Sequence, residues 1–181
     1  MTPRIFPLLS ACLSGFLAYP VLAGVPDLLA GLNSDDLDAR TKAEKTLFSE
    51  AAHAGRPGAE DERAAYSEAL CEALREEPPP LTAHTLVRQL QSIGRAEAVR
   101  TLSQLLQHGD AHLGEAARMA LTANPSPEAG NALVAALRQT TDPRMIKGIL
   151  GALGVRGHPQ AVPILRDALA DPAFAETAAI A

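Results

Sequence analysis

The segment IKGILGALGVRGHPQAVPILRDALADP, residues 146–172, decides the fold class, because it contains a complete helix–turn–helix unit. An apolar stretch is followed by a break at Gly154 and Gly157, where glycine permits the chain to turn after a helix. A second apolar stretch then places Leu165 and Leu169 four residues apart, on one face of a helix. The segment therefore predicts two short antiparallel helices joined by a turn.

Two segments upstream have the same organisation. They are LVRQLQSIGRAEAVRTLSQLLQHGD, residues 86–110, and GEAARMALTANPSPEAGNALVAALRQTTD, residues 114–142. Ala98, Ala129 and Ala161 occupy equivalent places in the three segments, 31 and 32 residues apart. A helix pair of about 30 residues that recurs in series is typical of an α-solenoid.

The apolar stripes explain why the units must stack. Val99, Leu102 and Leu106 follow helical spacing and cover one face, which a single pair of short helices cannot bury by itself. Neighbouring units can bury it, and full burial of a leucine side chain contributes about 1.5–3 kcal/mol. We therefore expect an all-α fold, a right-handed α-solenoid of stacked antiparallel helix pairs. Its units would span residues 81–110, 111–142 and 143–172, with a partial unit at 173–181.

Aspartate and proline mark the expected helix starts. Asp accepts hydrogen bonds from the free N–H groups of a first turn, and Pro at the first helical position loses a donor that has no partner there. The Asp-Pro pairs 142–143 and 171–172 are each expected to start a helix. Pro127 and Pro159 are expected to start the second helices of the later units.

Residues 24–80 are less regular and are expected to form an N-terminal helical capping region, which a solenoid needs for solubility. The pattern predicts helices over residues 25–32, 36–54 and 60–77. The triple proline 78–80 ends the last of these and predicts a stiff extended connector.

Cysteine is scarce in this chain. Cys12 and Cys71 are the two cysteines, and Cys71 lies on the edge of the apolar face of its helix. We expect a small, half-buried side chain there. The alternative is a reactive thiol or a disulfide to another chain.

The first 23 residues have the features of a secretory signal peptide. Arg4 precedes an uncharged, mostly apolar run, and Val21-Leu22-Ala23 provides tolerated residues before a cleavage site. We expect cleavage after Ala23 and a periplasmic or extracellular bacterial protein. The alternatives are an uncleaved membrane anchor and a lipid anchor at Cys12, because residues 9–12, LSAC, resemble a lipobox.

Composition and charge exclude several classes of protein. Tryptophan is absent and aromatic residues make up 3%, which suits close helix packing better than a β-sandwich. The formal net charge is -5, and removal of residues 1–23 leaves 15 basic and 21 acidic residues. Acidic and basic residues are interspersed, and the basic residues form no stripe in the sequence that could bind phosphate groups. We therefore expect a protein partner and no nucleic acid.

A family resemblance covers residues 88–172. The phrases RQLQSIGRAEAV, NPSPEAGNAL, ILGALGVRGHPQAVPIL and ALADP are similar to HEAT-like repeats of the phycobilisome-lyase type. The resemblance implies a HEAT/armadillo-like solenoid. Members of this family include chromophore lyases, metal-dependent hydroxylases and plain scaffolds. The hydroxylases hold iron with repeated His-Glu dipeptides, and this sequence contains no His-Glu dipeptide.

Other catalytic motifs are also missing. The sequence has no Cys-x-x-Cys, no Gly-x-Ser-x-Gly and no phosphate-binding glycine loop. His108 and His112, with Asp110, are the closest metal-ligating group, but they flank a predicted turn, and zinc needs three or four converging ligands. We expect no catalytic residue, no cofactor and no metal.

The remaining candidate for function is a binding surface. The resemblance implies that the second helices line the concave side of the stack, and polar residues lie there opposite the apolar stripes. We expect a non-enzymatic scaffold that binds a protein. The alternatives are a regulatory segment of a longer polypeptide and a lyase-like or metal-assisted enzyme. The candidate partner-binding residues are Glu97, Arg100, Gln104, Gln107, Asn131, Arg138, Gln139 and Arg166.

Overall fold

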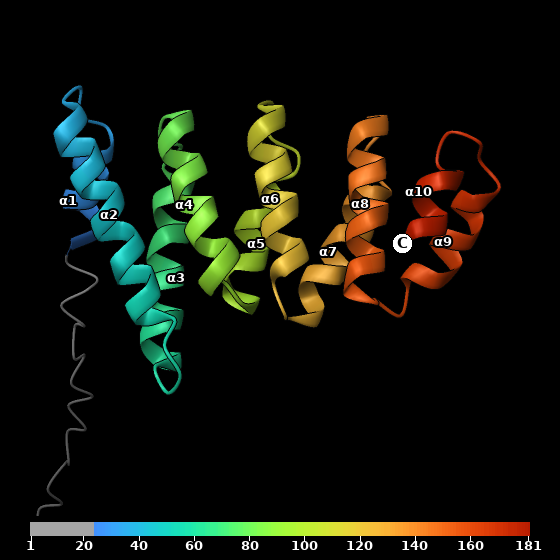
Figure 1. Ribbon diagram of the computed structural model, residues 1–181, viewed down its shortest axis with the longest axis horizontal. Helices are drawn as coiled ribbons and strands as arrows, with labels where there is room; N and C mark the ends of the chain where they lie inside the picture. The colour runs from blue at the N-terminus through green and yellow to red at the C-terminus, as the bar shows by residue number, and fades with distance from the viewer. Residues whose placement is uncertain (1–23) are drawn as a thin grey trace, which may run out of the picture.

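The structure is a computed structural model that describes residues 24–181. These residues form ten helices and no strand, as the repeat pattern predicts (Figure 1). The predicted signal peptide lies outside the described residues. The helices are α1 Val25–Leu32, α2 Leu37–Ala54, α3 Glu60–Arg75, α4 Pro80–Ile93, α5 Ala96–Leu105, α6 Ala111–Ala123, α7 Pro127–Leu137, α8 Pro143–Arg156, α9 Ala161–Leu169 and α10 Ala175–Ile180.

The helices form a row of pairs in two layers (Figure 1). One layer contains α2, α4, α6, α8 and α10, each packed against the next. In the other layer α3 packs on α5, and α5 packs on α7. Each pair thus contacts its neighbours in sequence, which confirms the serial stacking and the all-α solenoid.

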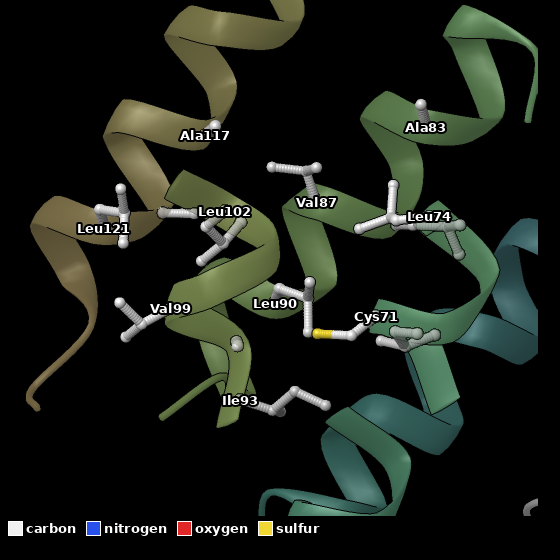
Figure 2. Close-up of a cluster of buried hydrophobic side chains, with 14 of the residues drawn as sticks. Cys71, Leu74, Ala83, Val87, Leu90, Ile93, Val99, Leu102, Ala117 and Leu121 are labelled. Carbon is white, nitrogen blue, oxygen red and sulfur yellow. The ribbon is translucent and has the colours of Figure 1, made fainter. Parts of the chain in front are cut away.

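Small and branched apolar side chains fill the space between the layers. Ala98, Ala129 and Ala161, which set the repeat register, are all buried. Alanine at these places lets the second helices approach their neighbours closely. Figure 2 shows how leucine, isoleucine and valine side chains from α3 to α6 meet in one cluster. The labelled members of this cluster include Leu74, Val87, Leu90, Ile93, Val99, Leu102 and Leu121.

Helix starts follow the expected chemistry at some positions. The Asp142 carboxylate accepts the Arg144 N–H at 2.9 Å, and Pro143 is the first residue of α8. Pro127 likewise begins α7. Gly157 ends α8 with a φ of 58°, the left-handed conformation that favours glycine.

Two predicted helix starts are wrong. Asp171 and Pro172 begin a turn, because the Asp171 carboxylate accepts the Ala173 N–H at 2.9 Å, and α10 starts only at Ala175. An aspartate that bonds the backbone two residues on stabilises a turn as readily as a helix start. Pro159 also lies in a turn, two residues before α9 begins.

The N-terminal region agrees with the predicted helices except at its connector. α3 ends at Arg75, two residues early, because Glu77 adopts a left-handed φ of 51° ahead of Pro78. Pro80 is the first residue of α4, where a missing N–H costs nothing. The extended connector is therefore shorter than the triple proline.

The prediction for Cys71 is also wrong. The side chain is fully buried in the cluster of Figure 2, and not half-buried. Burial raises the pKa of its thiol to about 11. A buried thiol that stays protonated at neutral pH is unsuited to disulfide exchange with another chain.

Candidate interaction surface

The second helices of the first two full units present a continuous polar row. In the register set by Ala98 and Ala129, Arg100 is equivalent to Asn131, and Gln107 is equivalent to Arg138. All four side chains are exposed, and the leucines of the same helices point the other way into the core. We call this row the ledge and define it as Arg100, Gln104, Gln107, Asn131, Arg138 and Gln139.

One hydrogen bond joins the two halves of the ledge. The Gln107 amide nitrogen donates to the Gln139 amide oxygen, although the residues belong to successive units. The bond connects the end of α5 to the end of α7, so the ledge is one surface across two repeats. Six of the eight predicted binding residues are therefore brought together.

Glu97 lies outside the ledge, because its carboxylate is already occupied. Its Oε1 atom lies 2.7 Å from Arg63 Nη1 and accepts the Arg95 N–H at 3.0 Å. Burial alone would raise the pKa of this carboxyl. Hydrogen bonds from the backbone and from Arg63 outweigh burial and hold the pKa below its usual value. Glu97 therefore fastens α3 to the start of α5 and is only partly accessible to a partner.

Arg166 also lies off the ledge, although it is exposed. Counting from Ala161 makes Asp167, and not Arg166, the equivalent of Gln104 in this row. Arg166 is equivalent to Ser103, which is half-buried, and to Val134, which is buried, so its position does not belong to the exposed row. Aligning all three units on the repeated alanine would have found this difference from the sequence.

The ledge is a basic, donor-rich surface on an acidic chain. With Glu97 occupied, it holds two arginines and four amide side chains, and it holds no carboxylate. Neither Arg100 nor Arg138 forms an ion pair with the residues that the structure describes. Both guanidinium groups are therefore free to bind an acidic group.

A hollow of about 790 Å³ borders the ledge where α3 and α5 end and α4 and α6 begin. Gln104 and Gln107 line it together with His108 and Asp110. The Asp110 carboxylate accepts the backbone N–H groups of Leu113 and His112, which lower its pKa. Asp110 thus caps α6 and is engaged with the backbone.

The His108–Asp110–His112 group forms a helix start. The His108 Nδ1 atom accepts the Asp110 N–H at 3.1 Å, and His112 is exposed on the first turn of α6. Within residues 24–181, no group of three or more His, Cys, Asp or Glu side chains is arranged to hold a metal ion.

The other layer carries an apolar groove that sequence reasoning missed. The groove has a volume of about 860 Å³ and lies over α2, α4 and α6. Phe48, Leu81 and Met119 line it and are 67%, 64% and 45% exposed. Each is a single apolar residue beside a buried stripe, so periodicity alone gives no sign that the three gather on one surface.

In the part of the chain that the structure describes, no helix combines the length and the apolar character needed to cross a membrane.

Comparison with known proteins agrees with the repeat architecture. The family model for HEAT repeats matches residues 67–145 and 115–181, which together cover more than half of the chain. Searches of curated proteins and of solved structures gave no match. The matched residues include α4 to α10 and all three units found from the alanine register. The chain therefore belongs to the HEAT repeat family.

Proposed function

We propose that this chain is a non-enzymatic scaffold that binds an acidic surface of a protein partner through the ledge, outside the cytoplasm. The observation that carries the proposal is the pair of free arginines in a row of amide side chains, with the neighbouring carboxylate of Glu97 already bound to Arg63. HEAT repeats generally serve as protein-interaction scaffolds, which supports the class of function.

The chemistry of the ledge favours carboxylates. Arginine presents a planar fork of donors that matches a carboxylate in two hydrogen bonds, and amides add neutral donors and acceptors. Arg100 and Arg138 lie on different units, so a partner that binds both must carry acidic groups on a surface and not at a single point. No aromatic residue belongs to the ledge, so we expect a salt-sensitive contact of modest affinity.

The groove over α2, α4 and α6 is a second candidate surface for the same function. Its exposed Phe48, Leu81 and Met119 would suit an apolar segment of a partner, because apolar side chains at the centre of an interface supply most of its binding energy. The two surfaces predict different salt dependence. Contact at the ledge weakens as salt rises, whereas contact in the groove does not.

The test is capture of a partner from a cell-envelope fraction, with three variants of the purified chain as bait. The ledge variant is Arg100→Ala/Gln104→Ala/Arg138→Ala, and the groove variant is Phe48→Ser/Leu81→Ser/Met119→Ser. Arg144→Ala/Lys147→Ala is the matched control, because it also removes two exposed positive charges, from α8.

We expect the ledge variant alone to lose the partner, with all variants equally helical by circular dichroism. Each lost arginine contact to an acidic group at such a surface costs about 1–3 kcal/mol of binding. Capture that survives in the ledge variant and fails in the groove variant would move the function to the other layer.

The compartment is tested separately. A mature N-terminus at Gly24, found by mass spectrometry of protein purified from its native host, supports export after cleavage. A lipidated Cys12 would point to a membrane-anchored scaffold, and an intact Met1 would contradict cleavage.

A further inference from the structure

The apolar groove over α2, α4 and α6 has a buried amide in its floor. Its rim carries the exposed Phe48, Leu81 and Met119, one from each helix, and its lining includes Val87 and Gln89 of α4. Val87 is 1% exposed and Gln89 is 6% exposed, so the groove reaches down between the helices. The surface is therefore hollowed and not flat, and a narrow segment of a partner fits it better than a broad face.

The side-chain amide of Gln89 has no partner within the described part of the protein. The side-chain hydrogen bonds of α4 are formed there by Thr82 and Thr85, and Gln89 forms none. Its amide is not among the fully enclosed polar atoms without a partner, so it keeps an accessible side, which opens into the groove. The amide thus offers both a hydrogen-bond donor and an acceptor to whatever enters the groove.

The charge at the centre of the groove is positive. Arg88 lies on α4, the middle one of the three helices, and its side chain is exposed (Figure 1). It forms no ion pair with the described residues, and α4 contains no acidic residue. Glu44, the acidic residue that lines the groove, is next to Lys45 on α2, so their charges offset each other. A complementary ligand therefore carries a negative charge over α4 and apolar groups on both sides of it.

Hydrogen bonding distinguishes an extended segment from a helix as the occupant. A helix has used most of its backbone donors and acceptors internally, whereas an extended segment still offers N–H and C=O groups that can bond the Gln89 amide. We propose that the groove binds an extended segment of a partner protein in which an acidic residue lies between two apolar residues. The proposal rests on the scaffold function and deepens it, because it names the chemistry that this second surface binds.

The spacing of the helices sets the spacing of residues in the bound segment. Packed helices lie about 8–10 Å apart, so α2 and α6, which carry Phe48 and Met119, are about 16–20 Å apart across α4. An extended chain rises about 3.3 Å per residue, so the two apolar residues should be about five or six positions apart. The acidic residue should lie about midway, over Arg88, whose guanidinium can bind a carboxylate through two N–H donors.

Synthetic peptides test the proposal by isothermal titration calorimetry with the full chain. The probe Gly-Leu-Ser-Ser-Asp-Ser-Ser-Leu-Gly has an aspartate midway between two leucines, and a second probe has lysine in place of the aspartate. The wild type should bind the aspartate peptide about tenfold more tightly, because lysine would meet the positive Arg88. Arg88→Glu should reverse this preference. The groove variant Phe48→Ser/Leu81→Ser/Met119→Ser should bind neither peptide.

Gln89→Leu separates a role in binding from a role in the fold. It replaces the amide by an apolar side chain of similar size, so it should weaken binding of the aspartate peptide about fivefold without lowering the free energy of unfolding. Lower stability with unchanged peptide binding would instead show a structural role and contradict the proposal. The ledge variant is the matched control and should bind the peptide as the wild type does, so failure at the ledge and failure in the groove are distinguishable.

Three further outcomes would overturn the proposal. The first is that neither peptide binds the wild type at millimolar concentration. The second is that the preference for aspartate survives Arg88→Glu. The third is binding of phosphatidylglycerol vesicles by the wild type and not by the groove variant, together with no binding of the peptides, which would assign the groove to a lipid surface.

Discussion

Helices α7 and α9 occupy equivalent places in successive units, but they are packed very differently. Five residues of α7 are buried, whereas in α9 only Ala161 is buried. The packing differs accordingly, since α7 lies against α5, α6 and α8, whereas α9 lies mainly against α8 and α10. In a solenoid each unit is stabilised by its neighbours, so the same apolar pattern yields a firm core in one place and an accessible surface in another.

The largest expected effect on the free energy of unfolding comes from truncating a buried side chain of α7, the better packed helix. Leu133→Ala in α7 removes a side chain with no exposed surface and should lower the free energy of unfolding by about 2–5 kcal/mol. Leu169→Ala in α9, at half exposure, should cost about 1 kcal/mol or less. Urea denaturation of both variants measures the difference, and equal losses would contradict the comparison.

The next effect tests how the third unit is fastened to the second. The Arg156 guanidinium at the end of α8 donates to four backbone carbonyls, those of Leu121, Thr122, Asn124 and Ser126. Arg156→Ala leaves these carbonyls without their charged donor and should cost about 1.5–3 kcal/mol.

Hydrogen exchange shows where that stability is lost. In Arg156→Ala, faster exchange should appear in α8 to α10 and at the end of α6, with α2 to α4 unchanged. Arg156→Lys is the matched control, because it keeps the charge but cannot reach four carbonyls. Uniformly faster exchange along the whole chain would show that the units unfold together.

The smallest effect concerns the Glu97–Arg63 bridge between α3 and α5. Because the folded pKa of Glu97 lies below its usual value, the bridge stabilises at neutral pH. That stability is lost as the pH falls from the ordinary glutamate value, about 4.3, through the lower folded value. Glu97→Gln should cost about 1 kcal/mol or less at pH 7, since the pair is partly exposed. Thermal melts at pH 7 and pH 3 should show a smaller cost at pH 3 than at pH 7.

Much of the fold could be predicted from the sequence, because its signals are local. Helical spacing of leucine and the repeated alanine fix the class, the register and most boundaries. The turns at Asp171 and Pro159 could not be told from helix starts, since a capping aspartate and a proline are equally common in turns.

The candidate site was predicted less completely. Exposed polar residues on α5 and α7 follow from the pattern, but the ion pair that removes Glu97 joins residues 34 apart in the sequence. No local sequence pattern predicts that Arg63 pairs with Glu97. The gathering of Phe48, Leu81 and Met119 likewise depends on how three first helices lie side by side.

The hydrogen bond between Gln107 and Gln139 has a mechanical consequence. The two arginines of the ledge belong to different units, so their separation changes whenever the stack bends at that joint. A rigid ligand with fixed spacing between its acidic groups would bind one curvature better than others and would shift the population toward it. The curvature of the row of repeats would then differ between the free and the bound protein.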